Sequence, residues 1–333
     1  MKNSFNMFLL LAEELSFNKA AKRAFITQQC FSDHIKRLEK QYHTKFFYRK
    51  PEIALTPSGQ IMKQTLLKIQ MLEKNMDIVL DQIENGDRGT LRFGINPNRA
   101  SILLPKIFPA FHKRFPLVNL QLTLDDTAIM AQKLLAGKID AFLGINTPPD
   151  ALYDARHILD EGLYLIISDK TLRKYFSYTY PDCISQFKNG VSLEVFHEIP
   201  MIQRNAPSKL GAIVDDYCCK NHIMINSILL INDFDTQLQL CKNMEIVSIM
   251  PSMCITSALE ASIGDKSDNE NRTYAFPLLG LENVQRVDFI IQHGVPLPCY
   301  VQKLYELIRF EYSVSVKPSV PFRNDIKRLK FPL

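Results

Sequence analysis

The chain has 333 residues, of which 46% are hydrophobic and 23% charged, which is typical of a globular protein and long enough for two or three domains. No apolar run reaches the roughly 18 residues that a membrane helix needs. The short apolar run at residues 8–12 is followed directly by two glutamates, which argues against a signal peptide, so we expect a cytoplasmic protein.

The seven cysteines are scattered and odd in number, which argues against a disulfide framework. Cys218 and Cys219 are the only cysteines clustered near a histidine, His222. Adjacent thiols do not easily surround one tetrahedral zinc ion, and no second ligand pair follows at a finger spacing. We therefore expect packed thiols here, with no metal and no cofactor.

Positive charge is concentrated at the two ends of the chain. Residues 1–60 hold ten Lys/Arg against five Asp/Glu, and residues 317–333 hold five against one. The long middle is mildly acidic, with 25 basic and 29 acidic residues. A basic head on a neutral body suggests a surface for a polyanion, although charged faces are usually only solvated.

The first 41 residues favour three helices. Residues 4–14 carry one apolar face, Ser16 is a candidate N-cap for a short helix over 18–24, and Thr27 is a candidate N-cap for a third helix. In the third helix the apolar residues recur at i, i+4 and i+7, as Phe31, Ile35 and Leu38.

The opposite face of the third helix is polar and suits hydrogen bonding. Two short helices joined by a tight turn, the second with such a face, form the helix-turn-helix arrangement, whose second helix enters the major groove of DNA. We therefore predict DNA contacts from the start of this helix. The candidates are Thr27, Gln28, Gln29, Ser32, Asp33 and Lys36.

A small wing is expected to follow. Two extended segments, 45–49 and 53–55, flank a turn at 50–52, which places Arg49 and Lys50 near the tip, where they can meet phosphates or the minor groove. Thr56 then caps a new helix, with a proline at its first position.

The segments "FLLLAEELSFNKAAKRAFITQQCFSDHIKRLEK", "FFYR" and "LTPSG" together resemble the N-terminal winged helix-turn-helix of the LysR-type transcriptional regulators. The resemblance implies contacts to bases and backbone from Gln28 and Ser32, and a wing arginine at Arg49. Gln29, Cys30 and Asp33 depart from the usual pattern, which affects the recognised sequence rather than the fold. Asp33 would repel phosphates but could accept a hydrogen bond from cytosine.

A long helix is predicted from 57 to 85, ending at a break over 85–89. Its apolar residues are spaced by three or four and form a narrow seam suited to pairing with another helix. The alternative is that the seam packs on its own chain. The resembling family dimerises through this helix. The seam residues are Met62, Leu66, Ile69, Leu72, Met76, Val79 and Ile83.

The remaining chain alternates strands with helices, which favours a parallel sheet covered on both faces. Strands are expected at 91–95, 118–124, 139–144, near 163–168, 200–204, 227–231 and 246–250, and at 286–292. Helices are expected at 102–115, 129–136 and 298–312, and others between the later strands. No nucleotide-binding, metalloprotease or hydrolase motif occurs, so we expect no enzyme activity.

The resemblance continues through "GTLRFGINPNRASILLPKIFPAFHKRFPLVNLQLTLDD" and "KLLAGKIDAFLGI", and "IVSIMP" matches a later element, with Met244 and Ile246 replacing its glycines. It implies a two-lobed α/β effector domain of the periplasmic-binding-protein type. The domains expected are a winged helix-turn-helix (1–58, mainly α), a linker helix and hinge (59–88), an effector domain (89–316) and a basic tail (317–333). Within the effector domain, lobe I comprises 89–162 and 268–316, and lobe II comprises 163–267.

Such sheets bind ligands at the carboxyl ends of their strands, and the family's effectors are often small acids. The candidate effector-binding residues lie at the ends of strands and at the starts of two helices, where backbone N–H groups can hold a carboxylate. Two arginines would suit an anion, although both could instead be surface salt-bridge residues. The candidates are Asn98, Arg99, Ser101, Thr127, Gln203 and Arg204.

These features predict a homo-oligomeric regulator, dimeric through the linker helix and tetrameric overall. It would bind promoter DNA and change its contacts with DNA or RNA polymerase when a small molecule, for example an organic acid, binds between the lobes. The alternative is a solute-binding or enzymatic α/β body with a non-functional helix-turn-helix head.

Overall fold

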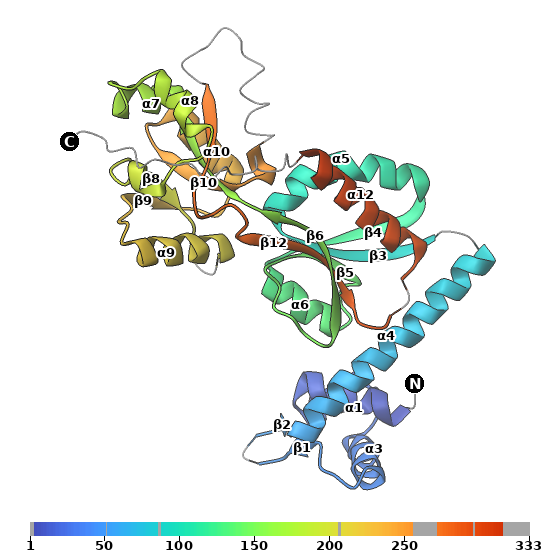
Figure 1. Cartoon of the computed structure of the whole chain (residues 1–333). Helices are drawn as coiled ribbons and strands as arrows, with labels where there is room; N and C mark the ends of the chain where they lie inside the picture. The colour runs from blue at the N-terminus through green and yellow to red at the C-terminus, as the bar shows by residue number, and fades with distance from the viewer. Residues whose placement is uncertain are drawn as a thin grey trace.

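The computed structural model describes residues 3–50, 52–85, 88–205, 208–255, 272–295 and 297–315. A small helical head leads through the long helix α4 into a body with two β-sheets (Figure 1). Within the described residues, no helix is long and apolar enough to cross a membrane.

The head has the predicted helices. Ser16 accepts a hydrogen bond from the backbone N–H of Lys19, and Thr27 accepts one from that of Cys30, so both predicted caps are confirmed. Phe8 and Phe31 are fully buried at the centre of the head. The elements are α1 (Asn3–Glu14), α2 (Phe17–Arg23), α3 (Gln28–Gln41) and a wing of two antiparallel strands, β1 (Phe47–Tyr48) and β2 (Ala54–Leu55).

The wing is fastened to the first turn of α4 (Pro57–Asn85). Thr56 donates from its hydroxyl to the carbonyl of Lys45 and accepts from the N–H of Gly59. A Cβ atom on Gly59 would lie 2.1 Å from the carbonyl oxygen of Phe46, so only glycine permits this approach. The orientation of the wing relative to α4 is therefore fixed by backbone contacts.

The apolar seam of α4 divides into two parts. Met62 and Leu66 are buried in the core of the head, so this part packs on its own chain. Leu72, Met76 and Leu80 are 43%, 55% and 52% exposed. The side chains of Val79 and Ile83, and residues 86–87 of the expected hinge, lie outside the described part of the structure.

The first sheet of the body has the strand order β4-β3-β5-β12-β6. Helices α5 and α12 cover one of its faces, and α6 covers the other (Figure 1). The strands are β3 (Arg88–Ile95), β4 (Leu117–Leu124), β5 (Ala141–Ile145), β6 (Tyr153–Glu161) and β12 (Gln285–Gln292), and the helices are α5 (Pro97–Arg114), α6 (Thr127–Leu135) and α12 (Cys299–Ser315).

The second sheet has the order β11-β7-β10-β8-β9. Its strands are β7 (Leu163–Ser168), β8 (Met201–Gln203), β9 (Ser227–Leu230), β10 (Val247–Pro251) and β11 (Thr273–Pro277). Its helices are α7 (Asp169–Tyr175), α8 (Asp182–Phe187), α9 (Lys209–Asn221) and α10 (Phe234–Asn243), with a short 3-10 turn at Leu193–Phe196.

The expectation of a parallel sheet is wrong for part of each sheet. β3 pairs in parallel with β4 and β5, and β8 with β9 and β10, but β12 runs antiparallel to β5 and β6, and β7 runs antiparallel to β10 and β11. Alternation of strands and helices does not fix the direction of strands that return from far along the chain.

Two strands, β6 and β11, were not anticipated from the sequence. Because β11 belongs to the second sheet, the chain returns to the first sheet after residue 277, later than the expected residue 268. Residue 268 and the basic tail at 317–333 lie outside the described residues. The two sheets share a continuous apolar core, in which Phe93 and Phe289 of the first belong to the same cluster as Ile166 of the second.

Candidate nucleic-acid interface and interlobe cleft

The predicted reading face of α3 points to solvent. Thr27, Gln28 and Gln29 are exposed at the start of the helix, while Ser32 is half-buried one turn later. Thr27 uses its hydroxyl as the helix cap, so the amides of the two glutamines are the groups best placed to reach a base edge.

An internal ion pair occupies part of the same face. The carboxylate of Asp33 lies 3.5 Å from the ammonium of Lys36, and both side chains are more than half exposed. An exposed pair of this kind contributes little to stability and is easily broken. Lys36 can therefore leave Asp33 and pair with a DNA phosphate. The carboxylate of Asp33 would then be free to accept a hydrogen bond from cytosine.

The wing residues are tied back to α3. Arg49 donates from its guanidinium to the carboxylate of Glu39 at 3.3 Å, and its guanidinium carbon lies 5.6 Å from the ring centre of Phe17. Lys45 also lies 3.2 Å from that carboxylate. Lys50 is exposed near the tip, and its neighbour Pro51 lies outside the described residues.

The second candidate site lies between the two sheets, where Asn98 at the start of α5 bridges to the second lobe. Its amide donates to the carbonyl of Asn232 at 3.0 Å and accepts from the N–H of Phe234 at 3.1 Å. These two bonds fasten the start of α5 to the start of α10. Beside them, Asn96 donates to the carboxylate of Asp126, the N-cap residue of α6.

Two of the predicted effector residues already have internal partners. The exposed Ser101 donates from its hydroxyl to the carbonyl of Asn98. Thr127 is buried and accepts from the N–H of Ile145, which joins the start of α6 to the end of β5. Both hydroxyls therefore hold local structure.

Arg99 does not offer a free guanidinium, contrary to the sequence-based expectation. It is buried and lies 2.5 Å from the carboxylate of Glu161, with the hydroxyl of Tyr312 and the sulfur of Met253 also in contact. Burial acts to lower the pKa of Arg99, but Glu161 and Tyr312 outweigh it and raise the pKa. Arg99 is neither an anion ligand nor a surface salt-bridge residue: it links α5 to the end of β6 and to α12.

Arg204 has the opposite character. Its Nε donates to the hydroxyl of Ser208, and its guanidinium carbon lies over the ring of Phe234, 4.4 Å from the ring centre. One terminal nitrogen is buried without a hydrogen-bond partner in the described part of the chain. Burial lowers the pKa of Arg204, with partial compensation from Cys254, Asp126 and Asp233. No described carboxylate lies within ion-pair distance of it.

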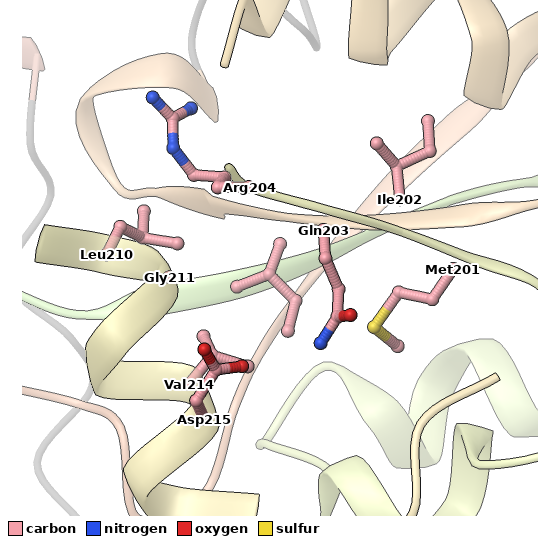
Figure 2. Close-up of a pocket in the computed structure, with 9 residues that line it drawn as sticks. Met201, Ile202, Gln203, Arg204, Leu210, Gly211, Val214 and Asp215 are labelled. Carbon is pink, nitrogen blue, oxygen red and sulfur yellow. The ribbon is translucent and has the colours of Figure 1, made fainter. Parts of the chain in front are cut away.

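Gln203 and Arg204 leave the strand in opposite directions (Figure 2). Both line a pocket between β8 and the first turns of α9, together with Gly211, Val214 and Asp215. The Gln203 side chain points toward Val214 and Asp215, on the other side of β8 from the Arg204 side chain (Figure 2). Of the six predicted residues, the structure joins Asn98 and Arg204 through their shared neighbour Phe234.

The groups that partner these residues were not predicted from the sequence. Glu39 was noted only as part of the family pattern, and Asp126, Phe234 and Glu161 were not singled out. Carboxylates at the ends of predicted strands or in cap positions were the available signal. The pairing itself depends on contacts between residues as far apart as Asn98 and Phe234, which no local pattern specifies.

Comparison with known families gives two matches. Residues 3–60 match the bacterial regulatory helix-turn-helix protein model of the lysR family, and residues 84–262 match the LysR substrate binding domain. The first covers the head, and the second covers the start of the body and most of its second lobe.

Curated relatives align with most of the chain. A probable RuBisCO transcriptional regulator from Trieres chinensis is 24% identical over 89% of this chain and 91% of its own length. A probable RuBisCO transcriptional regulator from Phaeodactylum tricornutum is 25% identical over 96% of this chain and 94% of its own length.

Solved structures share the fold. A full-length OxyR variant from Pseudomonas aeruginosa has a TM-score of 0.60 at 18% identity and covers 92% of this chain and 96% of its own. Full-length CbnR complexed with its target DNA has a TM-score of 0.51 at 18% identity and covers 93% of this chain and 99% of its own.

Proposed function

This chain belongs to the LysR family of transcriptional regulators, and we propose that it reads promoter DNA with the exposed start of α3 and responds to a small organic acid held by Arg204. In this arrangement Gln28, Gln29 and Ser32 face base edges. Arg49, Lys50 and Lys36 meet phosphates, which position the head without reading sequence. Acting on DNA, it would work in the compartment that holds that DNA, which in a bacterial cell is the cytoplasm.

The observation that carries the effector proposal is the unsatisfied guanidinium of Arg204. A buried donor without an acceptor is costly, and a carboxylate is the ligand that satisfies it best. The contact with the face of the Phe234 ring uses none of the guanidinium N–H groups, and Nη1, which has no partner among the described residues, can donate to such a ligand. The neighbouring Asp126 and Asp233 would disfavour a highly charged ligand, which favours a small monocarboxylate or dicarboxylate.

The ligand would act through the contact between the lobes. Asn98 and Arg204 meet at Phe234, so a ligand on Arg204 lies next to the hydrogen bonds that join α5 to α10. A ligand that binds one lobe arrangement better than another shifts the equilibrium toward it. The changed arrangement would then alter DNA bending and contact with RNA polymerase.

Oligomerisation through α4 follows from its exposed apolar residues. Leu72, Met76 and Leu80 are spaced by four and would pair with the same residues of a second copy. A helix-turn-helix reader commonly binds paired half-sites, which a dimer supplies, and two dimers would form the tetramer. Met76→Lys should yield monomers in sedimentation experiments, and an unchanged sedimentation coefficient would contradict this interface.

The effector proposal is tested by thermal shift of the full chain with a panel of small mono- and dicarboxylates. At least one acid should raise the melting temperature of the wild type and leave Arg204→Gln unchanged, because a ligand stabilises only the state that it binds. Lys220→Gln removes a surface cation of the same lobe and should respond like the wild type. An equal response in the Arg204→Gln protein would rule out this role.

The second candidate function, a small-molecule-binding body with a non-functional head, predicts no sequence-dependent DNA binding. The family match of the head and its exposed polar face weigh against it. Selection from a random-sequence duplex library decides between the two functions. A regulator enriches a common sequence, whereas a non-functional head enriches none.

A further inference from the structure

We infer that Glu39 is a positioning residue for DNA recognition: it holds the wing's Arg49 at a fixed distance from the reading face of α3. The inference rests on the proposed DNA contacts of the head. Glu39 is acidic, although the proposed partner of this domain is a polyanion that would repel it. Its position therefore calls for a physical reason.

The carboxylate of Glu39 is almost completely buried, with a side chain only 1% exposed. It lies in the last turn of α3, where the helix dipole disfavours negative charge, so it does not stabilise the helix by its position. One of its oxygens accepts the backbone N–H of Phe46 at the entry to the wing. The other faces Lys45 at 3.2 Å and Arg49 at 3.3 Å.

The two cations are unequal in exposure. Lys45 is 74% exposed and reaches the carboxylate from solvent, whereas Arg49 is 41% exposed and is held from two sides. Glu39 binds its guanidinium from α3, and the ring of Phe17 supports it from the first residue of α2. Arg49 thus contacts both helices of the helix-turn-helix motif as well as belonging to the wing.

A fixed guanidinium matters for specificity more than for attraction. When α3 is seated on its preferred sequence, the phosphates lie at defined distances from the helix, and a preorganised cation meets one of them without losing side-chain freedom. In a loosely bound, non-specific complex any cation in reach serves equally well. Glu39 therefore offsets part of the positive charge of the wing and fixes the position of the Arg49 guanidinium relative to α3.

The test uses the full chain and two DNA probes: a duplex selected from a random library by the wild type, and poly(dI-dC). Glu39→Gln retains an acceptor for the Phe46 N–H but loses the charge that holds Arg49. We expect its affinity for the selected duplex to fall about tenfold, while its affinity for poly(dI-dC) stays equal or rises. The non-specific salt slope should steepen by about one unit, because one more cation is free for phosphates.

Glu14→Gln provides the matched control, since it removes one negative charge from the same head at a site that pairs with Arg23. It should change both affinities by the same factor. In an Arg49→Ala background, Glu39→Gln should cause no further loss on the selected duplex, because the two residues act as one unit.

Equal changes on both probes for Glu39→Gln, or an undiminished loss in the Arg49→Ala background, would overturn the inference. Phe17→Leu keeps the proposal testable if Glu39→Gln does not fold: loss of the supporting ring should lower the selected-duplex affinity in the same direction, and equal losses on both probes would again contradict it. A failure of the wild type to select any sequence would instead refute the proposed DNA function itself.

Discussion

The reading face of the head and the contact region between the lobes differ in how many of their polar side chains already have partners within the chain. On the head, Gln28 and Gln29 are exposed, and the wing is tied back to α3 through Glu39. In the cleft, Asn98 and Thr127 hold backbone groups of the same chain. A surface that reads DNA can be complete before its partner arrives, whereas between the lobes the open donor of Arg204 lies among side chains that already hold backbone groups.

The largest expected effect lies at the buried ion pair. Arg99→Met leaves the carboxylate of Glu161 buried without its cation, which should lower the free energy of unfolding by about 3–5 kcal/mol. Urea unfolding of the full chain, followed by a probe in the body, measures the loss. Replacing both partners, with Arg99→Met and Glu161→Leu, should restore most of it.

Such a recovery would show that the pair is a structural link between α5 and the end of β6. If Arg99→Met instead leaves stability intact and abolishes the response to carboxylates, Arg99 is an effector ligand after all. The distinction between Arg99, held in an internal ion pair, and Arg204, open to a ligand, would then be contradicted.

Base recognition comes next in size. Gln28→Ala and Ser32→Ala should each reduce discrimination at one base position by about 1–3 kcal/mol, because a direct base contact is lost. Arg49→Ala should weaken binding to the selected duplex and to its single-base variants by a similar factor, because Arg49 meets a phosphate and not a base. Affinities for the selected duplex and its single-base variants measure both effects, and uniform losses for all three variants would remove this division of labour.

The bridge at Asn98 has a smaller expected effect. Asn98→Ala removes two hydrogen bonds between the lobes and should destabilise the body by about 1–2 kcal/mol. Exchange of the Phe234 amide hydrogen should become faster, because that N–H loses its acceptor. Ser101→Ala, which alters only a local hydrogen bond, is the control, and equal exchange in both variants would mean that Asn98 does not hold the cleft.

The sequence predicted the head more completely than the body, for a physical reason. Helix periodicity, the caps at Ser16 and Thr27 and the proline at the start of α4 are local signals, and each was confirmed. The strands β6 and β11 were missed because their pairing partners, β12 and β7, lie far away in the sequence.

The same distinction separates the site residues. The exposure of the α3 face follows from its own periodicity, which identifies the side opposite Phe31 and Ile35. The burial of Arg99 depends on Glu161 and Tyr312, which join it from 62 and 213 residues away along the chain. The sequence pattern predicts where along an element a side chain lies. Its burial and its hydrogen-bond partners depend on tertiary contacts.

The most direct test of the account measures binding of the full chain to its selected duplex as a function of salt. Each phosphate contact contributes about 0.9 to the slope of log affinity against log salt, so the cations of two heads should give a slope of several units. We expect this steep decrease, together with an affinity for the selected duplex that greatly exceeds the affinity for poly(dI-dC), an excess that Gln28→Ala reduces. A flat salt response with equal affinity for both probes would contradict it.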